Sequence, residues 1–168
     1  MKGELYMKQS YLVNPIKCFI ASLTALTFLI LSVTMVALVR PFSSAVFAAL
    51  SIIFIAVALQ NGSRIYINEQ GVQKFLLGRK IRGFMWEEIS ELGICGTKVF
   101  HKNHPERAGT LYIYASKQAL SDEERFHMIL KWPPKNQIYM TYTPQKLQMM
   151  QLLSCQKIHM YNTGDLTL

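Results

Sequence analysis

Two closely spaced histidines, His101 and His104, are the residues whose types most suggest metal chemistry, and Cys95 precedes them on the same stretch of chain. Zinc sites normally take three or four histidine, cysteine or carboxylate ligands. The remaining histidines, His127 and His159, fall on separate predicted elements, so spacing alone assembles no complete ligand set. We therefore interpret His101 and His104 as loop histidines and expect neither a metal nor any other cofactor.

Three glutamates, Glu87, Glu88 and Glu91, lie close enough in sequence to suggest paired carboxylates for acid–base catalysis. Such a role needs a nucleophile, a partnered histidine or a phosphate loop, and the sequence contains no GxSxG, HExxH, P-loop or dinucleotide-binding motif. We expect these glutamates on the solvated side of a strand end or turn, and a protein that is not an enzyme. A membrane-bound enzyme, the least favoured alternative, would need the two loop histidines and Cys95 to converge with a carboxylate.

The basic turn from Gly78 to Arg82 is the best candidate for a binding site. Arg79, Lys80 and Arg82 place three cations on one predicted hairpin, where they could contact lipid phosphates. Beside an anionic leaflet each cation contributes about 1 kcal/mol of attraction, so nonspecific attraction to the leaflet is one alternative. A solubilising turn that only follows the usual excess of positive charge on the cytoplasmic side is another.

Two uncharged apolar stretches, Cys18–Val39 and Pro41–Ser63, precede all of these candidate residues, and only Arg40 separates the two stretches. At about 1.5 Å per residue the first stretch is long enough, as a helix, to cross a hydrocarbon core about 30 Å thick. It is longer than the apolar part of a signal peptide and lacks a clear cleavage site. We predict a tight two-helix transmembrane hairpin over residues 18–60, with spans of about 18–39 and 42–60.

The basic residues around the hairpin predict its orientation, because short cytoplasmic flanks are enriched in lysine and arginine. Lys2, Lys8 and Lys17 precede the hairpin, and several more follow it closely. We predict a multi-pass protein of the cell membrane with both termini in the cytoplasm and with free thiols. Alanines spaced by four, Ala21 with Ala25 and Ala45 with Ala49, are predicted to let the helices pack closely.

The rest of the chain is long enough for one small soluble domain. We predict a cytoplasmic tail over 1–17, a domain over 64–156 and a C-terminal tail over 157–168. The net charge of +8 favours contact with the lipid bilayer and its anionic headgroups. It does not indicate nucleic acid, because no basic stripe is interleaved with aromatic residues.

Strand-like alternation and turn residues predict several strands in this domain, at about 64–68, 72–77, 81–86, 110–114 and 137–142. A capping-box spacing at Ser121 predicts a helix to Lys131 whose buried face carries Phe126, Ile129 and Leu130. Threonine followed by proline at Thr143 predicts a terminal helix.

Tyrosines recur on the predicted strands. They form either an exposed aromatic surface for a partner or a layer packed under the helices, and the sequence leaves both open. The tyrosines concerned are Tyr66, Tyr112, Tyr114, Tyr139 and Tyr142.

Three segments in this order resemble bacterial membrane proteins with a pleckstrin-homology-like (PH-like) domain: Ile65–Val72, Gly78–Ile81 and Phe84–Ile89. They supply an apolar strand, a Glu-x-Gly turn, a second strand and a Trp-acid-x-Ile element, and the resemblance covers about residues 60 to 155. It implies an α+β domain, an antiparallel β-barrel or sandwich closed by a C-terminal helix, that binds lipids or proteins without catalysing a reaction.

We therefore expect a membrane-anchored binding or scaffolding module at the inner leaflet, with a protein partner. The alternative is a small subunit of a larger membrane assembly, in which the helical hairpin is the interface. An anchor would tolerate replacement of both spans by unrelated apolar helices, whereas an assembly subunit would not.

Overall fold

The computed structural model describes residues 9–98, 108–154 and 157–161. The chain divides into two compact units. One unit, Leu12–Arg64, contains two long helices. The described residues of the other unit, Met1–Tyr11 with Ile65–Leu168, form two β-sheets, two shorter α-helices and a short 3-10 helix.

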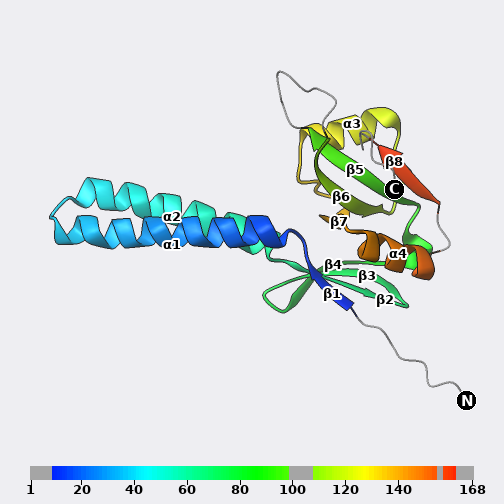
Figure 1. Ribbon diagram of the computed structural model, residues 1–168, viewed down its shortest axis with the longest axis horizontal. Helices are drawn as coiled ribbons and strands as arrows, with labels where there is room; N and C mark the ends of the chain where they lie inside the picture. Colours follow the sequence, from blue (N-terminus) through cyan, green and yellow to red (C-terminus); the bar gives the residue numbers. More distant parts are fainter. Residues whose placement is uncertain (1–8, 99–107, 155–156, 162–168) are drawn as a thin grey trace, which may run out of the picture. The chain divides into compact units, whose positions relative to one another are not determined.

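The two long helices, α1 (Pro15–Ala37) and α2 (Pro41–Asn61), lie side by side as a hairpin (Figure 1). Their mean hydropathies of 2.2 and 2.5 and their lengths make both apolar and long enough to cross a membrane. Helix α1 begins at Pro15, earlier than predicted, because Asn14 caps it: its side chain accepts a 3.0 Å hydrogen bond from the Lys17 N–H.

Small residues line the contact between these helices, and serines supply hydrogen bonds across it. The Ser51 hydroxyl donates to the Ala25 carbonyl at 3.0 Å. Ser32 and Ser44 also lie close enough for each hydroxyl to donate to the other residue's carbonyl, at 3.0 Å. Such bonds add to close packing in an apolar environment.

The predicted packing role of the alanines is confirmed for one helix and wrong for the other. Ala21 and Ala25 are buried, whereas Ala45 and Ala49 on α2 are exposed. Ser44 and Ser51 occupy the contact face of α2 instead. We attribute the difference to the hydroxyls, which satisfy carbonyls of the facing helix and so pack closely without an unpaired polar group.

We expect Ser51→Leu to weaken the helical hairpin by about 1–3 kcal/mol, because the larger side chain must push α1 and α2 apart. Titration of the full-length protein from mild into denaturing detergent, followed by circular dichroism, measures the loss. Ala45→Leu is the matched control on the exposed side of α2. Equal stability of the two variants would show that the helices do not pack through Ser51.

The first sheet has the strand order β1-β2-β3-β4. Its strands are β1 (Gln9–Leu12), β2 (Arg64–Asn68), β3 (Gly71–Leu76) and β4 (Arg79–Met85). Strand β1 precedes the helical hairpin and its neighbour β2 follows it, so the helical hairpin is an insertion within this sheet. The segment predicted as an N-terminal tail thus supplies a strand.

Tyr11 of β1 also contacts the last helix of the domain, α4 (Pro144–Leu153). Its hydroxyl lies 3.7 Å from the Met149 sulfur, and the Lys146 Nζ lies 5.4 Å from the centre of its ring. Strand β1 therefore belongs to the sheet unit through side-chain contacts as well as through the sheet.

The second sheet has the order β7-β6-β5-β8. Its strands are β5 (Glu91–Lys98), β6 (Ala108–Ser116), β7 (Ile138–Thr141) and β8 (Ile158–Tyr161). Strand β8 pairs in parallel with β5, and the other pairs are antiparallel. The predicted α+β class is confirmed. Within the described residues the strands form two sheets and no closed barrel, and the second sheet is mixed rather than purely antiparallel.

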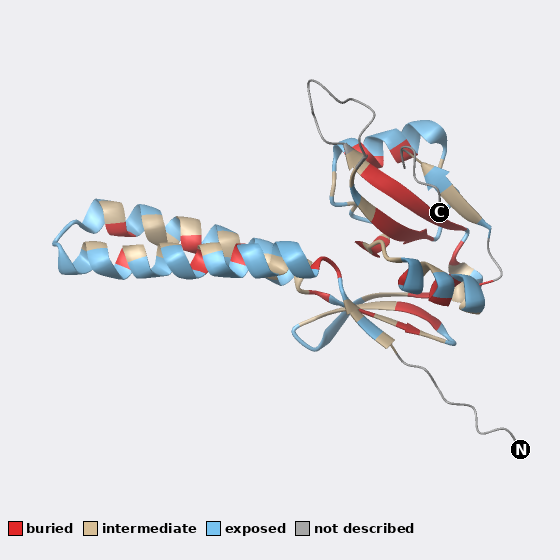
Figure 2. Ribbon diagram, viewed as in Figure 1, coloured by how far each residue is buried: buried red, intermediate tan, exposed pale blue. Residues whose placement is uncertain are grey.

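Two short α-helices cap this unit's described part, and both begin as predicted. Helix α3 (Asp122–Leu130) has the capping box of Ser121 and Glu124, and the Thr143 hydroxyl accepts from the Lys146 N–H at the start of α4. The most continuously buried segments are β5 and β6 (Figure 2).

The face that α3 buries differs from the prediction. Arg125, Met128 and Ile129 are buried, and Phe126 and Leu130 are exposed. Only Ile129 was placed correctly. The reason is that Arg125 has a buried ionic partner, which hydropathy alone cannot reveal.

Three of the five tyrosines pack in the interior of the domain, as one of the two alternatives predicts. Tyr112, Tyr114 and Tyr139 are buried, and the ring of Tyr112 contacts both Tyr139 and Trp132, with centroid distances of 6.0 and 4.5 Å. These three residues form no exposed aromatic surface. Tyr66 and Tyr142 are half-buried.

Candidate functional site: the basic β3–β4 hairpin

The predicted basic turn is a β-hairpin closed by two residues, Leu77 and Gly78. Both have left-handed backbone angles, with φ of 48° and 81°. This is the geometry of a type I′ turn, whose twist matches that of the flanking strands. The turn places Arg79 and Lys80 at the start of β4.

A β-bulge places two of the three predicted cations, Lys80 and Arg82, on opposite faces of the sheet. Lys74 pairs with Arg82, and the next residue, Phe75, pairs with Lys80, so Ile81 is an extra residue in β4. Paired residues share a face of the sheet and successive residues alternate, so Arg82 and Lys80 lie on opposite faces. The sequence predicts three cations on one hairpin, but it does not reveal this bulge.

Arg82 is engaged by the fold. Its guanidinium donates to the backbone carbonyl of Lys135 and, at 3.4 Å, to that of Gln137, just before β7. On the same face the Lys74 Nζ lies 4.8 Å from the centre of the Tyr139 ring. Burial, and then the charge of Arg82, lower the pKa of Lys74. Arg82 therefore joins the two sheets, which reduces its capacity to bind a ligand.

Arg79 and Lys80 are exposed instead. Across residues 9–98, 108–154 and 157–161 neither side chain has a hydrogen bond or an ion pair, although the backbones of both residues pair with β3. Their charges are consequently available to an external anion. Of the three predicted headgroup-binding residues, these two are exposed and Arg82 is half-buried, and lipid binding by any of them stays a prediction.

The three candidate glutamates have different environments. Glu87 is exposed, and Glu88 is paired with Lys117 at 2.8 Å and accepts from the Met85 N–H at 3.0 Å. That hydrogen bond caps the short 3-10 helix η1 (Trp86–Glu88). Glu91 is buried, so the prediction of a solvated side chain is wrong for it.

Glu91 lies at the centre of a buried network on the α3 face of β5. Its carboxylate accepts from the Arg125 Nε and Nη2 at 2.9 Å each, from the Tyr114 hydroxyl at 2.5 Å and from the Leu120 N–H at 2.7 Å. Gly93 makes room for this arrangement, since a Cβ there would lie 2.4 Å from the Tyr114 ring. Each of the two carboxylate oxygens of Glu91 therefore accepts two hydrogen bonds.

The hydrogen bonds of this network favour the ionised form of the Glu91 carboxylate. Burial raises the pKa of Glu91, but the hydrogen bonds from Arg125, Tyr114 and Leu120 outweigh it, and the net pKa is lowered. The pKa of Tyr114 is raised, first by burial and then by its bond to Glu91. The hydrogen bond to Glu91 raises the pKa of Arg125. The carboxylate is therefore charged, fully bonded and poorly suited to act as a general base.

Sequence reasoning missed this network, although one signal was present. Arg125 precedes Met128 and Ile129 by three and four positions, the spacing of one helix face. A charged residue on that face needs a buried partner. Glu91 lies at every second position of β5 with Gly93 and Cys95, so these three residues share one face of the strand.

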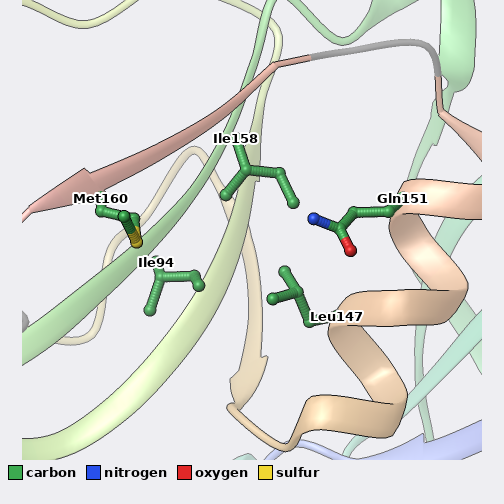
Figure 3. A pocket seen from close by; sticks show the side chains of 5 residues that line it. All are labelled: Ile94, Leu147, Gln151, Ile158 and Met160. Carbon is green, nitrogen blue, oxygen red and sulfur yellow. The ribbon is translucent and has the colours of Figure 1, made fainter. Parts of the chain in front are cut away.

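An open pocket of about 450 Å³ lies between α4 and the strands β5 and β8 (Figure 3). Apolar side chains from all three elements converge on it, and the Gln151 amide, which points toward Ile158, is the polar group of the lining. This lining suits an apolar group. The residues concerned are Ile94, Leu147, Gln151, Ile158 and Met160.

The predicted metal candidates His101 and His104 lie outside the described residues. Cys95 is buried, and burial raises the pKa of its thiol to about 12. In the described part of the chain no three His, Cys, Asp or Glu side chains are grouped as metal ligands would be.

The chain matches no protein-family model, and searches of curated proteins and of solved structures return no significant match.

Proposed function

We propose that this protein is a membrane-anchored, non-catalytic binding module, with a PH-like domain held at the inner leaflet of the cell membrane. The observation that carries the proposal is the insertion of the helical hairpin between β1 and β2. Because both strands belong to one sheet, the two ends of the helical hairpin must emerge on the same side of a membrane. The basic flanks favour the cytoplasmic side, with both termini there.

We propose that the helical hairpin acts by confining the sheet unit to the surface of the membrane. Only Gly62 and Ser63 separate α2 from β2, so the sheet unit cannot move far from the end of the helical hairpin. Such a short connection gives a high effective concentration of the domain at the bilayer surface. Weak contacts from exposed cations to anionic headgroups are then sufficient, and a protein partner is recruited to the membrane.

The chemistry of the buried network supports a role without catalysis. Arg125 donates two hydrogen bonds to the Glu91 carboxylate, and the Tyr114 hydroxyl donates another. These groups therefore stabilise the fold.

Exchange of the spans tests this proposal against the alternative of an assembly subunit. Both helices are replaced by unrelated apolar helices of equal length, and partner proteins are compared after crosslinking in native membranes. We expect the exchanged protein to remain in the membrane and to retain the crosslinks that the unaltered protein makes through its sheet unit. Loss of these crosslinks, with the exchanged protein still folded in the membrane, would favour the assembly subunit.

A further inference from the structure

The residue at the end of the β3–β4 hairpin is unexpected. Leu77 is 82% exposed, more than any other large apolar side chain in the described part of the sheet unit. Its φ of 48° is left-handed, a conformation that costs a side chain with a Cβ about 1–2 kcal/mol. Asparagine, aspartate or glycine is the usual choice at such a position. Neither packing nor backbone preference explains a leucine here.

The neighbours of Leu77 combine apolar and basic character. Ile81, the bulged residue, is 53% exposed, and Arg79 and Lys80 lie between the two apolar residues. Apolar side chains beside cations are typical of segments that lie in the interface of an anionic bilayer. A strained, exposed turn of this composition is a candidate for function.

The position of this turn in the sheet also indicates a contact with the bilayer interface. The two-residue connection Glu69–Gln70 makes β2 and β3 antiparallel, so the end of β3 lies where β2 begins. Strand β2 in turn begins three residues after α2 ends, a reach of about 10 Å. The turn and the chain's exit from the helical hairpin therefore share one end of the sheet.

We propose that the β3–β4 turn is a membrane-contact site, in which Leu77 and Ile81 insert into the interface of an anionic phospholipid leaflet while Arg79 and Lys80 contact its phosphates. This inference rests on the proposed membrane anchorage. It replaces a purely ionic contact by a mixed one, and it leaves out Arg82, which is bound to backbone carbonyls.

Fluorescence of the full-length protein in vesicles tests the inference. An environment-sensitive probe is attached at Leu77→Cys, and a matched probe at Leu152→Cys reports on another leucine of similar exposure, 78%. Cys18 and Cys155 are replaced by alanine in both proteins. The vesicles contain phosphatidylcholine alone or mixed with phosphatidylglycerol, and nitroxide-labelled lipids quench probes that enter the bilayer.

We expect the Leu77 probe, but not the Leu152 probe, to shift to the blue and to be quenched by nitroxide lipids in anionic vesicles. Arg79→Ala with Lys80→Ala should lower the equilibrium constant for insertion by about 30-fold, the equivalent of two lost cation contacts. Equal quenching of the two probes in protein that floats with the vesicles would overturn the inference and leave the anchorage standing. Failure of the protein to float would overturn the anchorage, and this inference with it.

A second variant separates membrane contact from folding. Leu77→Asn removes the apolar side chain and suits the left-handed backbone, so the variant should be at least as stable as the parent protein. With the probe at Ile81→Cys, the same change should lower insertion by about tenfold, because a leucine no longer leaves water. Unchanged insertion would contradict the proposed role of Leu77.

Discussion

Replacement of Arg125 by methionine should lower the free energy of unfolding by about 3–5 kcal/mol. The change leaves the Glu91 carboxylate buried without the two hydrogen bonds, at 2.9 Å each, that now neutralise it. Chemical unfolding of the full-length protein in mild detergent micelles, followed by tryptophan fluorescence, measures the difference. Arg79→Met is the matched control, because Arg79 is exposed. A loss below about 1 kcal/mol would be the value of a surface ion pair and would contradict the buried network.

Removal of both charges should cost less than removal of one. A buried ion pair can often be exchanged for apolar side chains at little cost, whereas one stranded charge is expensive. We therefore expect Glu91→Leu with Arg125→Met to be more stable than Arg125→Met alone. A double variant as unstable as the sum of both single changes would show that the two residues act independently.

The same pair predicts an acid-sensitive stability. The folded pKa of Glu91 is lowered relative to about 4.3 in the unfolded chain, so its contribution is complete above that value. The contribution is lost as the pH falls through the folded pKa. The difference in stability between the parent protein and the double variant should therefore shrink below about pH 4. A difference independent of pH would contradict a charged Glu91.

Gly71→Ala should be the other strongly destabilising change, with a loss of about 3 kcal/mol or more. Gly71 has a φ of 150°, and a Cβ there would lie 2.0 Å from the Phe84 carbonyl oxygen. That oxygen belongs to the backbone of β4, so the two strands would have to separate. Loss of the thermal transition, or a sharply lower Tm, is the expected result.

Gly78→Ala is the control for Gly71→Ala. Gly78 also has a left-handed backbone, with φ of 81°, but a Cβ there would meet nothing within 4 Å. Its cost is limited to backbone strain, about 1 kcal/mol. If both variants lost equal stability, the close approach of β3 and β4 at Gly71 would not be important.

The elements that the sequence predicts best are those with a local physical cause. Apolar length predicts α1 and α2, and capping residues predict the starts of α3 and α4. The turn at Asn68 is equally local: its side chain accepts from the N–H groups of Gln70 and Gly71, at 3.1 and 3.0 Å. Trp86 then binds that turn, because its indole N–H donates to the Asn68 carbonyl at 2.9 Å.

The features that the sequence does not predict depend on partners distant in the chain. Strands β1 and β8 lie in segments predicted as tails, and they form by pairing with β2 and β5. Arg125 resembles a surface residue until Glu91 faces it. Arg82 lies in a basic turn, but it is bound to carbonyls more than fifty positions away. Tertiary contact decides each of these.

The most direct test of the proposed anchorage is cysteine labelling in intact cells with a maleimide that cannot cross the membrane. Single cysteines are placed at Val39, in the turn of the helical hairpin, and at Leu152, an exposed residue of the sheet unit, after the native cysteines are replaced by alanine. We predict that Val39→Cys reacts in intact cells and that Leu152→Cys reacts only after permeabilisation. Reaction of both positions from the outside, or of Leu152→Cys alone, would contradict a domain held at the inner leaflet.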